Sequence, residues 1–347
     1  MTKHQTQLTS SEIASIWTGY MNDSMSKCIL SYFLKQIEDE DIRPVIQFAY
    51  DISFKHLEKL TNIFKQEKLP IPTAFTMGHD VNLNAPRLFT DSFMLTYINH
   101  MAKAGMLAYS GFVSMSARED IRTYFITGLQ EVSALFNQSS IVALSKGVFI
   151  RSPYISYPTT TDYVDSKQYL SGFSFFSKQR PLNSMEISHL FMNIQTNLIG
   201  AKLSLAFAQT SPRKDVQDWM IRGSKIAEKH IQIFTKALLN NDIQSPISSD
   251  IAISDSTIPA FSDKLTMFHM SFLTAAGTGN YATAAAASQR SDLFLNYERL
   301  SFEIAQYAKD GADIMIRHNW LEQPPGTKDK EQLAKKKNKP ICLEQTT

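Results

Sequence analysis

The sequence contains two copies of one long segment, and this duplication constrains the fold more than any other feature. The early part of the first copy aligns without a gap at a shift of 174 residues, and after a loop the alignment continues at a shift of 172. The pairs that carry this register include Glu12 with Glu186, His56 with His230, Asp91 with Asp263, Tyr109 with Tyr281, Asp120 with Asp292 and Glu131 with Glu303. A repeat of this length is too long for a solenoid period and indicates two copies of one domain.

Size, charge and cysteine content exclude several classes of protein. At 347 residues the chain is long for a single hydrophobic core, which agrees with a division into two domains. Its net charge of +2 gives no reason to expect nucleic acid or an anionic membrane as a partner. The two cysteines form no disulfide framework, and the polar residues 1–10 do not resemble a signal peptide. A reducing, cytoplasmic setting is therefore expected.

One uncharged stretch, residues 265–289, is long enough to cross a bilayer. It contains His269, Asn280 and many hydroxyl side chains, and its repeat partner carries Lys103. A helix buried inside a bundle explains this composition better than a membrane span does.

Each copy is expected to form four long helices. In the first copy, a Thr9-x-x-Glu12 capping box begins a helix whose apolar residues recur at helical spacing. A second helix covers about 42–66, a third begins at 90–91, and the capping-box pattern Ser116-x-x-Glu119 predicts the start of the fourth. The corresponding helices of the second copy are expected near 184–210, 213–240, 263–285 and 289–318.

The lengths of the connections predict how the helices are arranged. Short turns join helix one to two and helix three to four, whereas a long loop joins two to three. One long crossover between two antiparallel helix pairs is the ferritin-like arrangement of a four-helix bundle. The predicted fold is all-α, with two tandem ferritin-like four-helix bundles, each with a long crossover between helices 2 and 3. The expected divisions are a first bundle (8–155), a linker (156–182), a second bundle (183–326) and a disordered basic tail (327–347).

The linker is rich in aromatic residues. Phe173, Phe175 and Phe176 follow one another closely, and such a segment is too apolar to be left in water. These side chains are predicted to be buried where the two bundles meet. The lysine-rich tail lacks apolar periodicity and is expected to be dispensable for folding.

Three features together resemble a known family of spore-forming bacilli. They are the tandem layout, the crossover motif Asp-Val-Asn-x-x-Ala-Pro-Arg-x-Phe-Thr-Asp over 80–91, and the ending Lys-Gly-x-x-x-Arg-x-Pro over 146–153. The family is domain of unknown function 3231, and the resemblance covers about 10–155 and 184–326. It implies a ferritin-like fold related to spore coat protein F, and it supplies no catalytic residues. The second copy departs from the motif, with Asp250-Ile251-Ala252 in place of Asp80-Val81-Asn82.

A di-metal centre of the ferritin type needs carboxylates and a Glu-x-x-His pair on each of two helices. Only His189, in Glu186-Ile-Ser-His189, has a glutamate three residues before it, and Glu186 is better explained as part of a helix cap. A complete di-metal centre and a bound cofactor are therefore not expected. A single metal ion is left open, and the candidate ligands are His56, His230, Asp91, Asp263, Asp120 and Asp292. The alternative for the two histidines is a hydrogen bond to a neighbouring helix inside each bundle.

The function classes that remain are three. A non-catalytic structural or interaction protein is favoured, with self-association or spore-protein partners and a spore or stress setting implied by the resemblance. The alternatives are a divergent metal-carboxylate redox protein and a helical bundle that binds a small molecule. Nucleotide-binding glycine loops, nucleophile elbows and Cys-x-x-Cys motifs do not occur.

Overall fold

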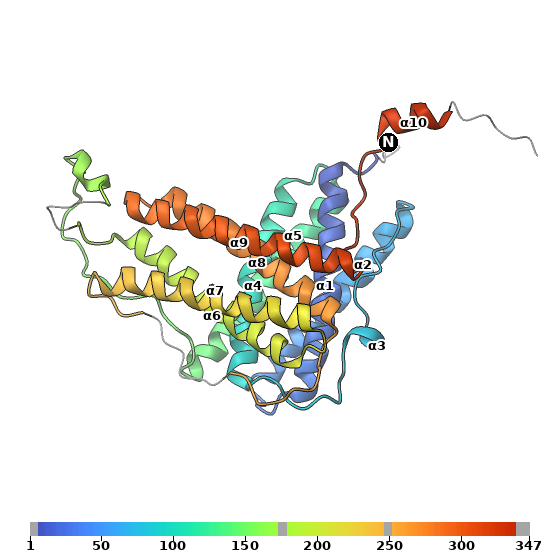
Figure 1. Cartoon of the computed structure of the whole chain (residues 1–347), viewed down its shortest axis with the longest axis horizontal. Helices are drawn as coiled ribbons and strands as arrows, with labels where there is room; N and C mark the ends of the chain where they lie inside the picture. The colour runs from blue at the N-terminus through green and yellow to red at the C-terminus, as the bar shows by residue number, and fades with distance from the viewer. Residues whose placement is uncertain (1–5, 173–178, 246–251, 338–347) are drawn as a thin grey trace, which may run out of the picture.

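A computed structural model describes residues 6–172, 179–245 and 252–337, and over these ranges the chain is helical, with two isolated β-bridges (Figure 1). The first half of the molecule, residues 6–155, contains four long helices and one short one. Their bounds are α1 (Ser10–Gln36), α2 (Arg43–Gln66), α3 (Met77–Asp80), α4 (Asp91–Ser114) and α5 (Glu119–Ser145). The second half, residues 183–326, contains α6 (Ser184–Thr210), α7 (Lys214–Leu239), α8 (Asp263–Ala287) and α9 (Ser291–Arg317). The expected order of helices is present in both halves.

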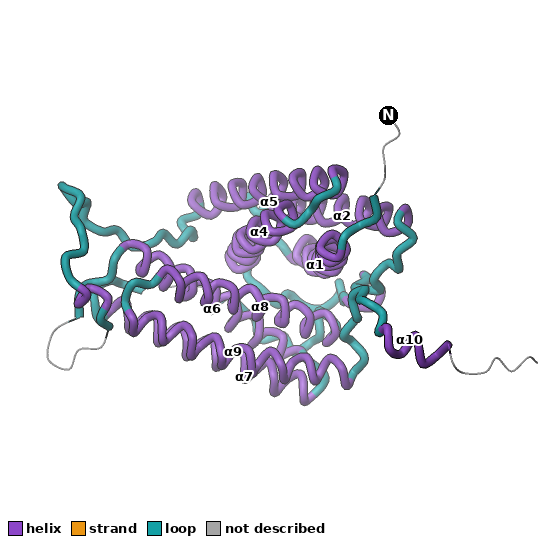
Figure 2. The backbone as a smooth tube through the Cα atoms, turned by 90° about the horizontal axis from the view of Figure 1, so that it is seen from above, coloured by secondary structure: helices purple, strands orange, loops and turns teal. Residues whose placement is uncertain are grey.

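Helix packing follows the same scheme in each half. In the first half α1 packs on α2 and α4 on α5, and the pairs meet through α2 with α5 and α1 with α4. In the second half α6 packs on α7 and α8 on α9, and these pairs meet through α6 with α8 and α7 with α9. The helices of the second half run along the long axis of the molecule, whereas α1 and α4 are seen end-on from above (Figure 2).

The starts of the helices show which of the predicted capping boxes form in the structure. Thr9 and Glu12 form the predicted capping box of α1, and Asn183 and Glu186 form the corresponding one of α6. The capping box predicted at Ser116 is wrong, because α5 begins two residues later, with Arg118 at its N-cap and no side-chain cap. The Ser116 hydroxyl instead donates back to the Phe112 carbonyl at 2.7 Å, and the Arg118 N–H donates to Glu12 at 2.7 Å.

The two long crossovers lie against each other and join the halves. Val81 bridges to Phe261 and Phe89 bridges to Ile253, in antiparallel fashion. These contacts correct the expected alignment of the crossovers: at a shift of 172, Val81 is the repeat partner of Ile253 rather than of Ile251, and Phe89 is the partner of Phe261. Each crossover therefore gives the other the same pair of contacts. The flanking backbone bonds are reciprocal too: Asn82 N–H donates to Ala260 and its partner Ser254 N–H donates to Leu88, both at 2.9 Å.

A hydrophobic core continuous across both halves fills the junction, and a smaller core lies farther out in each half. At the junction the Tyr32 ring meets the edge of Phe261 at 5.1 Å between ring centroids. Nearby, the buried Tyr97 hydroxyl lies 3.2 Å from Nε2 of His269, and these two residues are repeat partners. The two halves are therefore packed into one structure.

The segment between the halves is largely exposed where it is described. Residues 154–168 lie in solvent, and a short 3₁₀ turn, Lys167–Leu170, follows. Phe173, Phe175 and Phe176 lie outside the described residues, so their predicted burial stays a prediction. Within the tail, Lys330–Lys337 forms α10, which projects away from the other helices (Figure 1). In the described part of the chain, no helix combines the length and hydropathy needed to cross a membrane.

Candidate functional site: a buried histidine in each half

The first half closes around the imidazole of His56, which is 1% exposed. All four long helices contribute one polar group to it: Asp23 from α1, His56 from α2, Tyr109 from α4 and Glu131 from α5. Nε2 of His56 lies 2.6 Å from Glu131 Oε2, and Nδ1 lies 2.7 Å from the Tyr109 hydroxyl. Asp23 approaches the same Nδ1 at 3.4 Å. We call this set the first polar centre.

The second half repeats this arrangement at the equivalent positions. His230 on α7 lies 2.8 Å from the Tyr281 hydroxyl of α8 through Nδ1 and 3.0 Å from Glu303 of α9 through Nε2. The position of Asp23 is taken by Asn197 of α6, whose amide donates to the Tyr281 hydroxyl at 2.7 Å. This set, which we call the second polar centre, therefore has one carboxylate where the first has two.

The electrostatics of the two histidines differ in direction. Burial alone would lower the pKa of His56, but the Asp23 and Glu131 carboxylates outweigh it and raise the pKa to about 9. Burial lowers the pKa of His230, and the single carboxylate of Glu303 only partly offsets this. His56 is accordingly an imidazolium at neutral pH, whereas His230 is neutral.

Each polar centre borders a small cavity. The cavity in the first half has a volume of about 100 Å³, and the one in the second half about 70 Å³. Every residue that lines the second cavity is the repeat partner of a residue that lines the first, so the cavity belongs to the repeated unit. Both are large enough for ordered water but small for a typical ligand.

The four aspartates predicted as ligands lie elsewhere. Asp91 sits in the first turn of α4, accepts the Asp39 N–H at 3.0 Å and pairs with Arg87. Asp263 sits in the first turn of α8, where it accepts from the Ser211 hydroxyl at 2.8 Å and pairs with Arg213 at 2.9 Å. Asp91 therefore ties the start of α4 to the turn between α1 and α2, and Asp263 ties the start of α8 to the turn between α6 and α7.

Asp120 and Asp292 are held by arginines at the starts of α5 and α9. Arg118 donates to both oxygens of Asp120 at 2.9 and 2.6 Å, and this lowers the pKa of that carboxyl. Arg290 donates to Asp292 in the same bidentate way at 3.0 and 2.7 Å. Within the described residues the structure thus brings none of the four aspartates to His56 or His230.

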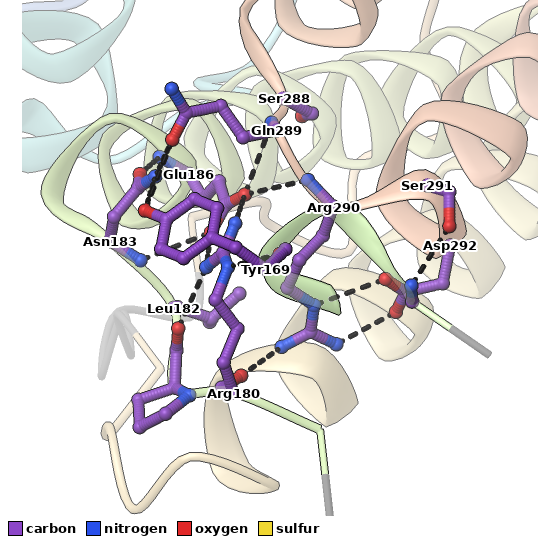
Figure 3. Close-up of polar contacts among 12 residues, drawn as sticks. Tyr169, Arg180, Leu182, Asn183, Glu186, Ser288, Gln289, Arg290, Ser291 and Asp292 are labelled. Carbon is purple, nitrogen blue, oxygen red and sulfur yellow. Dashed lines mark hydrogen bonds and ion pairs between the residues drawn. The ribbon is translucent and has the colours of Figure 1, made fainter. Parts of the chain in front are cut away.

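The Arg290 side chain also anchors the linker (Figure 3). Its remaining donors bind the Arg180 carbonyl at 3.1 Å and the Gln179 side chain at 2.8 Å. Arg180 in turn donates to both oxygens of the buried Glu186, at 2.9 and 2.7 Å. Glu186 also accepts the backbone N–H groups of Gln289 and Arg290, so this carboxylate links the start of α6, the linker and the start of α9. Burial would raise the pKa of Glu186, but these donors lower it.

Metal binding is the other role considered for these side chains. In the described ranges, no group of three or more histidine, cysteine, aspartate or glutamate side chains has a geometry that could hold a metal ion. The reason is visible at His56, where Asp23 and Glu131 approach opposite ring nitrogens and so cannot share one ion with the imidazole. His189 is partly exposed on α6, and Glu186 three residues earlier is occupied by Arg180.

Sequence reasoning found the two histidines but missed their partners. The tyrosine and glutamate partners recur in both copies of the repeat, as Tyr109 with Tyr281 and Glu131 with Glu303. This recurrence was the signal that could have identified them. Asp23 had no such signal, because its repeat partner is Asn197 and the side chain differs.

The fold and the two centres define a class: an all-helical protein built from two copies of one unit, each closed around a buried histidine. Within it, the chain belongs to the family described as protein of unknown function DUF3231, which matches residues 1–160 and again 171–333. A solved structure from Bacillus halodurans C-125, titled a "putative spore coat protein", is also similar. That alignment covers 44% of this chain and 98% of the other, at 20% identity and a TM-score of 0.41. No curated protein matches the chain.

Proposed function

We propose that this protein is a non-catalytic structural or interaction protein, in which each half is a ferritin-like bundle and the polar centres specify its packing. The observation that carries the proposal is the saturation of His56. Both of its ring nitrogens are bound by side chains of the same half, and the carboxylates lie on opposite sides of the ring. A histidine held in this way fixes the rotation of four helices against one another and presents no free nitrogen to a substrate or metal.

The long crossover between the second and third helices of each half supports the ferritin-like assignment. The resemblance to a family of spore-forming bacilli supports a setting in the spore or in stress. The redox alternative is less well supported, because its aspartate candidates serve as helix-start anchors.

The decisive experiment is elemental analysis of protein purified without chelators. We expect transition metals at well below one per chain. Two metal ions about 3.5–4 Å apart inside either half, bound by His56 or His230, would overturn the structural role and make redox chemistry the leading function.

The outer face of α9 supports an interaction role. Leu295, Phe302 and Ile316 recur at multiples of seven residues, which places them on one helical face, and they are 51%, 65% and 61% exposed. We propose that this face contacts a second copy of the chain. In sedimentation velocity, wild type should dimerise and Phe302→Glu should dissociate at least tenfold more easily. Tyr157→Glu, at a still more exposed aromatic residue in the linker, is the control. A wild-type protein that is monomeric at every concentration would contradict self-association.

A further inference from the structure

Two adjoining cavities lie where the halves meet, between α4, α6 and α8. Each has a volume of about 440 Å³, and both are lined by His100, Lys103 and Gln195. A volume of this size is within the range of about 300–1,000 Å³ typical of ligand sites. Because they share these three lining residues the two cavities adjoin, and we call them together the junction groove.

One end of the groove is cationic. Lys103 and Lys202 both line the first cavity, and both are partly buried. No aspartate or glutamate lines either cavity among the described residues. Over the same ranges, neither lysine amine has a hydrogen bond or an ion pair, and Lys103 lies only over the Phe136 ring, at 5.7 Å. Two partly buried ammonium groups without a counter-charge favour an anion.

The electrostatics agree with this geometry. Burial lowers the pKa of Lys103, and burial together with the Lys103 ammonium lowers the pKa of His100 to about 4. His100 is therefore neutral at pH 7 and adds a polar group to the groove without a charge.

The other end of the groove is apolar. The second cavity is walled by Leu107, Met192 and Phe272 together with small residues of α8 such as Ala276 and Gly279. A side chain added at Gly279 would meet nothing within 4 Å, so this wall is open to a guest. The groove therefore has a charged head and an apolar body.

We propose that the junction groove binds the anion of a fatty acid, with the carboxylate at Lys103 and Lys202 and the alkyl chain along α8. The stretch of α8 that lines the second cavity, from Phe272 to Thr283, is about 17 Å long at about 1.5 Å per residue. One leaflet's acyl chains span about 15 Å, half of a hydrocarbon core of about 30 Å, so a single chain fits within this length. The inference is independent of the structural role proposed above, and either can fail without the other.

The test is calorimetric titration of the full chain with dodecanoate and, in parallel, with the dodecyltrimethylammonium cation. We expect one saturable site per chain for dodecanoate and none for the cation. The double variant Lys103→Met/Lys202→Met should bind dodecanoate at least tenfold more weakly. Ala276→Phe, which fills the apolar end, should also abolish the site.

Two controls separate binding from folding. Lys225→Met/Lys309→Met removes the same charge from exposed lysines outside the groove and should leave affinity unchanged. Lys103→Arg/Lys202→Arg keeps the charge and should retain the site. Circular dichroism of each variant confirms that it folds. Equal affinity in wild type and Lys103→Met/Lys202→Met, equal affinity for the cation, or the absence of saturable binding would each overturn the proposal.

Discussion

The two polar centres share a histidine, a tyrosine and a glutamate on equivalent helices. At neutral pH, however, the histidine of the first centre is charged and that of the second is neutral. The difference is one side chain on the first helix of each half, Asp23 in one and Asn197 in the other. The carboxylate raises the pKa of His56 to about 9, whereas the pKa of His230 is lowered. The repeated helices thus determine where the imidazole lies, and the charged groups around it determine the direction in which its pKa moves.

The largest difference between the halves should appear when each histidine is removed. His56→Ala leaves Asp23 and Glu131 in the protein without their cation, and breaking a buried charged set costs about 3–5 kcal/mol. His230→Ala leaves fewer groups without a partner, because Glu303 keeps its ion pair with Lys229 and Asn197 still donates to Tyr281. We therefore expect it to lower the free energy of unfolding by about 1–3 kcal/mol. Urea denaturation followed by circular dichroism measures both. A greater loss for His230→Ala would contradict the comparison.

The pH dependence of stability should have opposite sign in the two centres. The folded pKa of His56 is above its ordinary value of 6.5, so its contribution is complete below pH 6.5 and is lost as pH rises through about 9. With about 1.4 kcal/mol per pKa unit, that loss is up to about 3 kcal/mol. The folded pKa of His230 is below 6.5, so its contribution is complete above pH 6.5 and falls at lower pH.

The pH dependence at each histidine is measured as the difference in free energy of unfolding between wild type and the alanine variant. The free energy of unfolding of wild type minus that of His56→Ala should shrink between pH 6.5 and 9. The corresponding difference for His230→Ala should shrink below pH 6.5. Two profiles of the same sign would show that Asp23 does not set the charge of His56.

Exchanging the differing side chains should exchange the titration of the two histidines. Asp23→Asn leaves His56 with one carboxylate, as in the second half, and its pKa should fall from about 9 by about two units or more. Asn197→Asp should raise the pKa of His230 above 6.5. Both are measured by NMR titration of the imidazole protons. An unmoved His56 pKa in Asp23→Asn would assign the shift to Glu131 instead.

A smaller effect is expected at a second pair of positions that differ between the halves. The first half has Ala49 and Leu135 beside its cavity, whereas the second has Gly223 and Tyr307. A methyl group at Gly223 would overlap the Tyr307 hydroxyl, so Gly223→Ala should cost about 1–3 kcal/mol. Gly223→Ala/Tyr307→Leu restores the combination found in the first half and should cost less than the sum of the single changes.

The control for that cycle is Ala49→Gly, which meets no such constraint and should cost only the usual helix penalty of about 0.5–1 kcal/mol. Additive single and double changes in the second half would show that the glycine and the tyrosine are not matched.

The helices could be read from the sequence because their signals are local. The capping boxes at Thr9 and Asn183 and the apolar spacing after them gave the starts of α1 and α6 correctly. The start of α5 was misplaced because its backbone is held by Glu12, a residue far away in sequence. The partners of His56 were missed for the same reason. They come from three other helices, and only the rotation of each helix in the packed structure decides which side chains meet.

The reciprocal contact between the crossovers has the form of a symmetric dimer interface, with an approximate two-fold axis passing between Tyr97 and His269. In a true homodimer a residue on the axis meets its own copy, so tyrosine would face tyrosine or histidine would face histidine. Joining both subunits in one chain removes this restriction. Positions 97 and 269 now carry different residues, so a hydroxyl meets an imidazole where a homodimer would bring two identical side chains together. The duplication has therefore let an interface inside the molecule become asymmetric. The lysines of the junction groove are a product of the same freedom, because the repeat partners of Lys103 and Lys202 are Ala275 and Cys28.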